Sequence, residues 1–324
     1  MALQPNSDST LEFYPPPDKR QRPDIPRVSV SKAPDQRGSV SLDKAEALHD
    51  TLALTNLVSR SNLRASVEAL ADFPTRHTLS RDFHQVTNWV VQQFRGLGYD
   101  DVALHSYKRD GASPNNVICV KPSSGGGSET VMLCAHYDCV MQRHNDATAR
   151  APGANDNATG VAVILEAARI FAQTDLKHRV QFVCFSGEEQ GMWGSTAYAA
   201  HVRREGLDVK FVLNLDQVGF PAASREIIVE RDLGNTVASN DQASQALANT
   251  LAQAMSDQLH IPVKLGPIYR SDYMPFEARG YVVIGLYESG ENYPGYHSDQ
   301  DTPEKVDYDY LVDVGKSTVT AIST

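Results

Sequence analysis

The sequence is poor in cysteine, has no long apolar run and carries fewer basic than acidic residues. Four cysteines among 324 residues are too few for a disulfide scaffold, and their spacing matches no metal-binding cysteine motif. No stretch approaches the roughly 18 consecutive apolar residues of a transmembrane helix, so we expect no membrane partner. With 30 Lys and Arg against 40 Asp and Glu, the formal net charge is −10. This balance argues against nucleic acid as a partner, because its binding needs clustered cations.

The first 40 residues lack the apolar periodicity of the remaining chain. They contain 7 of the 17 prolines, including three in succession at 15–17. We therefore predict a Pro-rich flexible arm over 1–40 and one folded domain over 41–324. No basic segment followed by an apolar run opens the chain, so no signal peptide is visible. The sequence leaves open the compartment and whether the arm is a pro-segment.

From about residue 42, helical patterns alternate with short β-rich runs. The alternation predicts a single α/β domain, with helices on both faces of a largely parallel mixed central sheet. Expected helices cover 42–58, 63–70, 80–97, 158–172, 192–204, 242–259 and 308 to the end. Expected strands cover 116–120, 130–135, 180–185, 211–218, 227–230 and 282–287.

Acidic and imidazole side chains follow several of these strands. Ligands of such sheets bind beyond the carboxyl ends of the strands, so we expect these side chains to converge at one edge. The candidates are His136, Asp138, Asp156, Glu188, Glu189, Asp216 and His297.

Each candidate taken alone has an ordinary explanation. His136 and Asp138 can form a simple pair, adjacent glutamates are usually solvated, and Asp156 can cap the helix that follows it. Together, two histidines and three carboxylates match the ligands that zinc prefers, and they suffice for two ions that share one carboxylate. Only one of Glu188 and Glu189 can easily point at the metals, which leaves the other near a bound water as a general base.

The segments around these residues resemble the co-catalytic zinc aminopeptidases of peptidase family M28, the bacterial leucyl aminopeptidase type. The resemblance extends from about Leu63 to near the end of the chain. The matching segments occur in the family's order: 135–138 (AHYD), 152–160 (PGANDNATG), 186–191 (SGEEQG), 214–216 (NLD), 270–276 (RSDYMPF) and 296–302 (YHSDQDT).

The resemblance implies two zinc ions per chain and a role for each candidate. It makes His136 and Asp216 the terminal ligands of one zinc, Glu189 and His297 those of the other, and Asp156 the bridging carboxylate. It also makes Glu188 the general base, Asp138 the partner that orients His136, and Tyr296 a group that helps to polarise the scissile carbonyl.

The implied activity is that of a zinc-dependent aminopeptidase. Its substrates are peptides with a free N-terminus. A hydroxide that bridges the metals attacks the first peptide bond while Glu188 acts as general base. Family members are commonly extracellular or periplasmic.

The substrate pocket departs from the family pattern at two points. Gln217 stands where many relatives carry Met, and no cysteine pair lies near Ser271. Four of the 13 tyrosines fall between 281 and 296, which favours an aromatic pocket wall. We therefore predict substrate contacts from Gln217, Tyr287, Glu291 and Tyr293, with Glu291 suited to basic side chains.

Three alternatives stay open at this stage. A carboxypeptidase or dipeptidase of the same superfamily would need a basic residue for the substrate carboxylate, and Arg270 is the candidate. A glutaminyl cyclase of similar build would use a single zinc. A catalytically inactive binding module would be expected to lack some of the ligands or the base.

Overall fold

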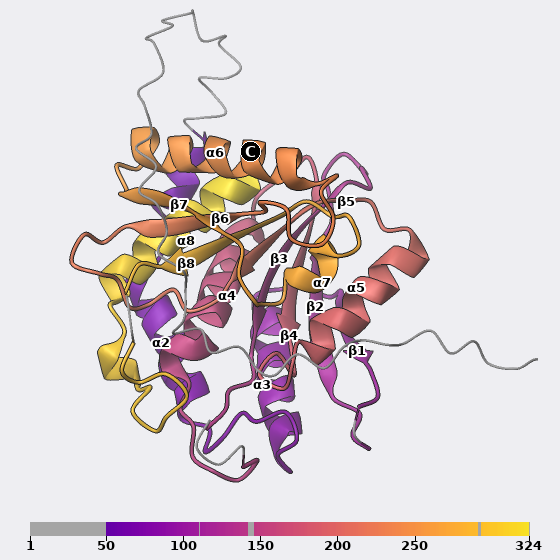
Figure 1. The fold of residues 1–324 in the computed structure, drawn as a ribbon, viewed down its shortest axis with the longest axis vertical. Helices are drawn as coiled ribbons and strands as arrows, with labels where there is room; N and C mark the ends of the chain where they lie inside the picture. The colour runs from indigo at the N-terminus through magenta and orange to yellow at the C-terminus, as the bar shows by residue number, and fades with distance from the viewer. Residues whose placement is uncertain (1–49, 110, 142–145, 291–292, 324) are drawn as a thin grey trace, which may run out of the picture.

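The computed structural model describes residues 50–109, 111–141, 146–290 and 293–323. The arm predicted over 1–40 and Glu291 therefore lie outside the described residues. Eight strands form one mixed sheet in the order β1-β2-β4-β3-β5-β8-β6-β7, with helices packed against it (Figure 1). The strands are β1 (Val102–Ser106), β2 (Asn115–Lys121), β3 (Thr130–His136), β4 (Arg179–Phe185), β5 (Val209–Leu215), β6 (Ile227–Arg231), β7 (Val263–Pro267) and β8 (Val283–Glu288).

The centre of the sheet is parallel and its outer parts contain the antiparallel pairs. β4, β3, β5 and β8 run parallel to their neighbours within this group, whereas β2 joins β4, and β6 joins β8, in antiparallel register. The predicted largely parallel mixed sheet is confirmed. The carboxyl ends of β3, β4, β5 and β8 therefore meet at one edge.

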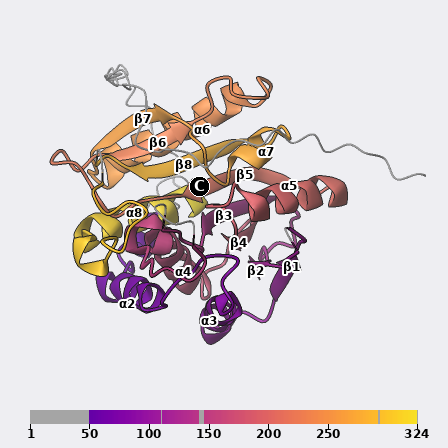
Figure 2. The ribbon, with the colours of Figure 1, turned by 60° about the horizontal axis from the view of Figure 1, so that its bottom comes forward.

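Helices cover both faces of the sheet, which is why the central strands are apolar on both sides. They are α2 (Arg60–Ala71), α3 (Phe83–Gly96), α4 (Thr159–Phe171), α5 (Trp193–Glu205), α6 (Asp241–Gln258), α7 (Met274–Glu277) and α8 (Tyr308–Ser323). Side chains of α2, α3, α4, α6 and α8 share one apolar core with the sheet, and those of α5 and α7 form the core on its other face. Figure 2 shows α2, α3, α4 and α8 on one side of the strands and α5 and α7 on the other.

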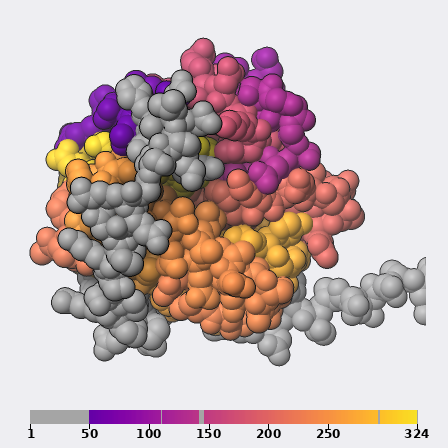
Figure 3. Space-filling view, turned by 90° about the horizontal axis from the view of Figure 1, so that it is seen from above, coloured from indigo at the N-terminus to yellow at the C-terminus, as the bar shows by residue number. Residues whose placement is uncertain are grey.

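The helix most deeply enclosed is α4, as its nearly uniform apolar sequence predicts. All but one of its residues are buried, because α2, α8 and β3 surround it. A kinked segment, Ala154–Ala158, leads into α4 and contains Asp156, whose φ of −111° and ψ of 90° are not helical. α6 is different, since it buries one stripe and exposes the rest on the surface seen in Figure 3.

Two strands and one helix were not expected from the sequence, namely β1, β7 and the four-residue α7. The expected strand over 211–218 ends earlier, at Leu215, because Gln217 turns the chain with a φ of 53°. No helix in the described part of the chain combines the length and the apolar character needed to span a bilayer.

Candidate active site

The candidate residues lie where the parallel strands end. His136 is the last residue of β3 and pairs in register with Phe185, the last residue of β4. Glu188 and Glu189 follow β4 within four residues, and Asp216 directly follows β5. The sheet register therefore brings residues that are up to 80 positions apart to the same edge.

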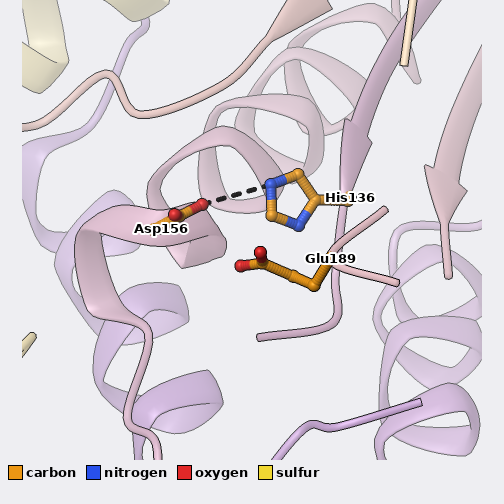
Figure 4. A group of neighbouring side chains, drawn as sticks. All are labelled: His136, Asp156 and Glu189. Carbon is orange, nitrogen blue, oxygen red and sulfur yellow. Dashed lines mark ion pairs between the residues drawn. The ribbon is translucent and has the colours of Figure 1, made fainter. Parts of the chain in front are cut away.

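The Asp156 carboxylate lies between two histidines. Its Oδ1 is 3.2 Å from Nε2 of His136, and its Oδ2 is 3.3 Å from Nε2 of His297. Figure 4 shows Asp156, His136 and Glu189 pointing toward one another. Each oxygen of one carboxylate thus faces a different imidazole, which is the arrangement that a bridging ligand requires.

Each histidine also meets a second carboxylate. Asp216 Oδ1 is 3.4 Å from His136 Nε2, and Glu189 Oε2 is 2.8 Å from His297 Nε2. The five residues therefore form two groups that share Asp156. All five side chains are buried.

A second layer of contacts fixes these groups. The backbone oxygen of Asp138 lies 3.1 Å from His136 Nδ1, so Nε2 is the nitrogen that faces the carboxylates. The Asp138 carboxylate accepts hydrogen bonds from the backbone N–H groups of Glu188 and Glu189, both at 3.3 Å. Ser271 donates its hydroxyl to Asp216 Oδ2 at 2.6 Å. These contacts orient the groups without occupying the oxygens that face the histidines.

The burial and the negative charge of this cluster favour the binding of a cation. Burial lowers the pKa of His136, but the carboxylates of Asp156 and Asp216 beside its ring outweigh this effect and hold that pKa well above its usual value. Burial likewise lowers the pKa of His297, while Glu189 and Asp156 raise it to about 10. Burial raises the pKa of Glu189, and it raises the pKa of nearby Asp272 to about 7. Carboxylates crowded in a buried site thus stabilise any added cation.

The donor set fits zinc. Among the described residues, His136 Nε2, His297 Nε2 and Glu189 Oε1 are buried and make no hydrogen bond of good geometry, although carboxylate oxygens face both nitrogens. Such atoms are costly unless a ligand satisfies them. Imidazole nitrogens and carboxylate oxygens are the donors that zinc takes in catalytic sites. His136, Asp156 and Glu189 also have ligand atoms within 4.8 Å of one another.

The remaining candidates lie at different distances from this cluster. Glu188 is buried beside Glu189, and the half-buried ring of Tyr296 stacks on His297 with centroids 3.7 Å apart. Gln217 is buried and donates its side-chain N–H to Asp156 Oδ2 at 3.2 Å. Tyr293 donates its hydroxyl to Asp301, and Tyr287 lies on β8 opposite Ile228.

Sequence reasoning missed three buried residues that hold the loops of the site. Asp301 binds the backbone of the Asp156 loop, and Glu288 accepts hydrogen bonds from Asn155, Gly219 and Phe220. Arg76, fully buried, donates to the backbone oxygens of four residues: Leu70, Tyr137, Pro152 and Gly153. Asp301 lay within a matching segment and was detectable as an acid in a loop near His297. Nothing in the sequence pattern marks Arg76, because its partners are carbonyl groups.

Comparison with known proteins identifies the family. The model of peptidase family M28 matches residues 115–322. A probable zinc metalloprotease of Leptosphaeria maculans is 28% identical over 320 residues, covering 82% of this chain and 73% of its own length. Leucine aminopeptidase 1 of Trichophyton equinum is 27% identical over 296 residues, covering 86% and 76%. Three further probable zinc metalloproteases are matched over 65–66% of their length, so this chain spans about two thirds of those proteins.

Solved structures share the fold. The aminopeptidase LapA of Legionella pneumophila superposes with a TM-score of 0.73 at 20% identity, covering 93% of this chain and 79% of that one. The glutaminyl cyclase of Porphyromonas gingivalis superposes with a TM-score of 0.68 at 22% identity, covering 82% and 98%. The same fold therefore occurs in enzymes with two different activities, and only the site can distinguish them.

Proposed function

Because the chain belongs to peptidase family M28, we propose that it is a zinc-dependent aminopeptidase that removes the N-terminal residue of peptides and uses two zinc ions. The observation that supports this most is Asp156, whose two oxygens face two different histidines at 3.2 and 3.3 Å. A site for one ion would not need a carboxylate shared in this way.

The proposed ligands divide into two sets. His136, Asp216 and Asp156 Oδ1 would hold one ion, and His297, Glu189 and Asp156 Oδ2 the other. When bound, the ions supply Lewis acidity, which lowers the pKa of water toward 7 and stabilises negative charge on the scissile carbonyl oxygen.

Glu188 is the proposed general base. Its carboxylate is buried beside the ligands, and its backbone N–H is fixed by Asp138 at 3.3 Å. From this position it accepts the proton of the attacking water and returns it to the leaving amine. Tyr296, whose ring stacks on His297, is the proposed donor of a hydrogen bond to the developing oxyanion. Asp138 orients His136.

A free α-amine suits the charge of this site. Asp138, Asp156, Glu188, Glu189 and Asp216 are buried in one small region, which favours a substrate that brings a positive group. The name of the Trichophyton relative, a leucine aminopeptidase, also supports peptides with a free N-terminus as substrates. Gln217, Tyr287 and Glu291 stay predicted substrate contacts. Tyr293, the fourth residue predicted as a contact, is buried and donates its hydroxyl to Asp301.

A panel of paired substrates tests the proposal. Leucyl p-nitroanilide and its N-acetylated counterpart are compared with and without a chelator. We expect turnover of the free amine at least 100-fold faster than that of the blocked one, loss of activity with chelator and recovery with zinc. Equal rates on both substrates would contradict the proposal. Glutaminyl peptides are assayed in parallel, and cyclisation without hydrolysis would assign the chain to the cyclases instead.

A further inference from the structure

Asp301 holds the backbone of the loop that contains Asp156. Its backbone oxygen accepts a hydrogen bond from Ala154 N at 3.1 Å, its Oδ1 accepts one from Asn155 N at 2.8 Å, and its Oδ2 accepts one from Asp156 N at 2.9 Å. Three successive N–H groups are thus bound by one residue that is 1% exposed. Hydrogen bonds to a buried carboxylate are among the strongest in proteins, so this loop has little freedom to move.

Tyr293 fixes the carboxylate of Asp301 in turn. Its hydroxyl donates to Asp301 Oδ1 at 2.6 Å, and its ring packs against Phe220 with centroids 4.8 Å apart. A Cβ atom on Gly295 would lie 2.6 Å from the Tyr293 hydroxyl, so the loop has room for this contact only because residue 295 is glycine. Tyr293 is itself buried, with 5% exposure.

Tyr293 and Asp301 flank His297 on the same loop. This loop therefore supplies His297 directly and controls the placement of Asp156 through the backbone. The carboxylate of Asp156 can face both histidines only if its main chain stays where Asp301 holds it.

Taking the zinc site proposed above as given, we propose that Asp301 and Tyr293 are positioning residues for that site. They hold the bridging ligand in the geometry that both ions require. On this account Tyr293 acts on the metals through Asp301, and its sequence-based assignment as a substrate contact is replaced. Outer contacts of this kind typically contribute 10–100-fold to metal affinity.

Two variants and one matched control test the proposal. Asp301→Asn places an amide N–H group against the N–H of a loop residue, and Tyr293→Phe removes only the hydroxyl. Glu166→Gln is the control, because Glu166 is also buried and also accepts a backbone hydrogen bond, from Ser59 N at 2.6 Å, but on the far part of α4. The zinc-loaded proteins are titrated with a chromophoric chelator, and thermal unfolding is recorded for each.

We expect zinc affinity to fall 10–100-fold in Asp301→Asn and severalfold in Tyr293→Phe. The KM of Tyr293→Phe for a leucyl substrate should be nearly unchanged. Glu166→Gln should lose thermal stability while its zinc affinity stays within twofold of wild type. If Asp301→Asn does not fold, the zinc affinity of Tyr293→Phe alone tests the proposal. Unchanged zinc affinity in Tyr293→Phe, with or without a raised KM, overturns the proposal. Zinc affinity is measured without substrate. Unchanged zinc affinity in Tyr293→Phe would therefore count against the positioning role alone and not against the aminopeptidase assignment.

Discussion

Glu188 and Glu189 are adjacent and both buried, yet their surroundings differ. Glu189 lies 2.8 Å from His297 Nε2. Burial lowers the pKa of His136, and the negative charge of Glu188 is among the causes that raise it, after Asp156 and Asp216. Both backbone N–H groups bind the same Asp138 carboxylate, so the main chain of this turn is fixed.

We therefore expect opposite results from the same substitution at these positions. Glu188→Gln keeps size and hydrogen bonding but cannot accept a proton, so kcat should fall by about 10²–10⁴-fold while both zinc ions remain. Glu189→Gln should lose zinc from one site. Elemental analysis together with steady-state kinetics checks both, and a loss of zinc in Glu188→Gln only would mean that the roles are exchanged.

Glu288 is a buried acid that is not among the proposed ligands, and its titration should be visible in the free energy of unfolding. Burial raises its pKa to about 8, against the lowering effect of N–H donors at Phe220, Asn155 and Gly219. The folded protein therefore binds a proton at Glu288 that the unfolded chain releases near pH 4.5. Stability from this group is complete below pH 4.5 and declines as the pH rises toward 8.

Glu288→Gln should abolish this loss of folding stability between pH 4.5 and pH 8. At pH 5 the variant should be less stable than wild type, because an amide cannot accept all the hydrogen bonds that Glu288 accepts. Between pH 5 and pH 8 this difference in the free energy of unfolding should shrink by at least about 1.4 kcal/mol, because only the wild type loses stability as Glu288 ionises. Denaturant unfolding of the zinc-loaded proteins at both pH values measures this difference. A deficit that is constant with pH would show that Glu288 does not titrate in this range.

The proposed ligands His136, Glu189 and Asp216 could be located from sequence because each stands at or just after the end of a strand whose apolar run is recognisable. Glu288 and Arg76 could not, because their partners include backbone N–H and carbonyl groups of distant loops. Side chains of that kind leave no periodic pattern, and only the folded chain shows what they bind.

At the scale of elements, the buried strands and long helices were predicted, and the exposed edge strands were not. β3 and β4 are buried along almost their whole length and read as continuous apolar runs. β1 and β7 lie at the two edges of the sheet, and none of the residues in β1 is fully buried. An edge strand needs little apolar sequence, so its pattern is weak.

The start of α5 packs unusually close to the loop that contains Glu188. A Cβ atom on Gly194 would lie 2.3 Å from the backbone oxygen of Ser186 and 2.2 Å from Asn116 Oδ1. Asn116 also donates its side-chain N–H to the backbone oxygen of Gly194 at 2.9 Å and accepts from Ser186 N. Any side chain at 194 would therefore push α5 away from the loop.

Gly194→Ala should consequently destabilise the protein by about 1–3 kcal/mol and lower kcat, because Glu188 moves with Ser186. Gly96→Ala is the control: it lies at the end of α3 with no atom within 4 Å of the added Cβ, and it should be neutral or slightly stabilising. Chemical denaturation and kinetics of both variants check this. Equal stability of the two would show that α5 can shift without cost.

For the whole molecule, the division into an arm and one domain stays a prediction, since residues 1–40 are outside the described part of the chain. Deleting residues 1–35 should leave zinc content and thermal stability close to those of the full chain, because Pro-rich segments contribute little to a core. Differential scanning calorimetry with zinc analysis tests this. A large drop in the unfolding temperature would mean that the arm packs against the domain.

The number of zinc ions per chain tests the central claim most directly, because the same fold occurs in a glutaminyl cyclase and the shared Asp156 is the observation that argues most for a pair of ions here. Native mass spectrometry of the zinc-loaded protein counts the ions on each folded chain, with Asp156→Ala as the variant that removes the shared ligand. We predict two zinc ions on the wild-type chain and loss of at least one in the variant. A wild-type chain that saturates at one zinc ion would contradict the two-metal aminopeptidase proposed here.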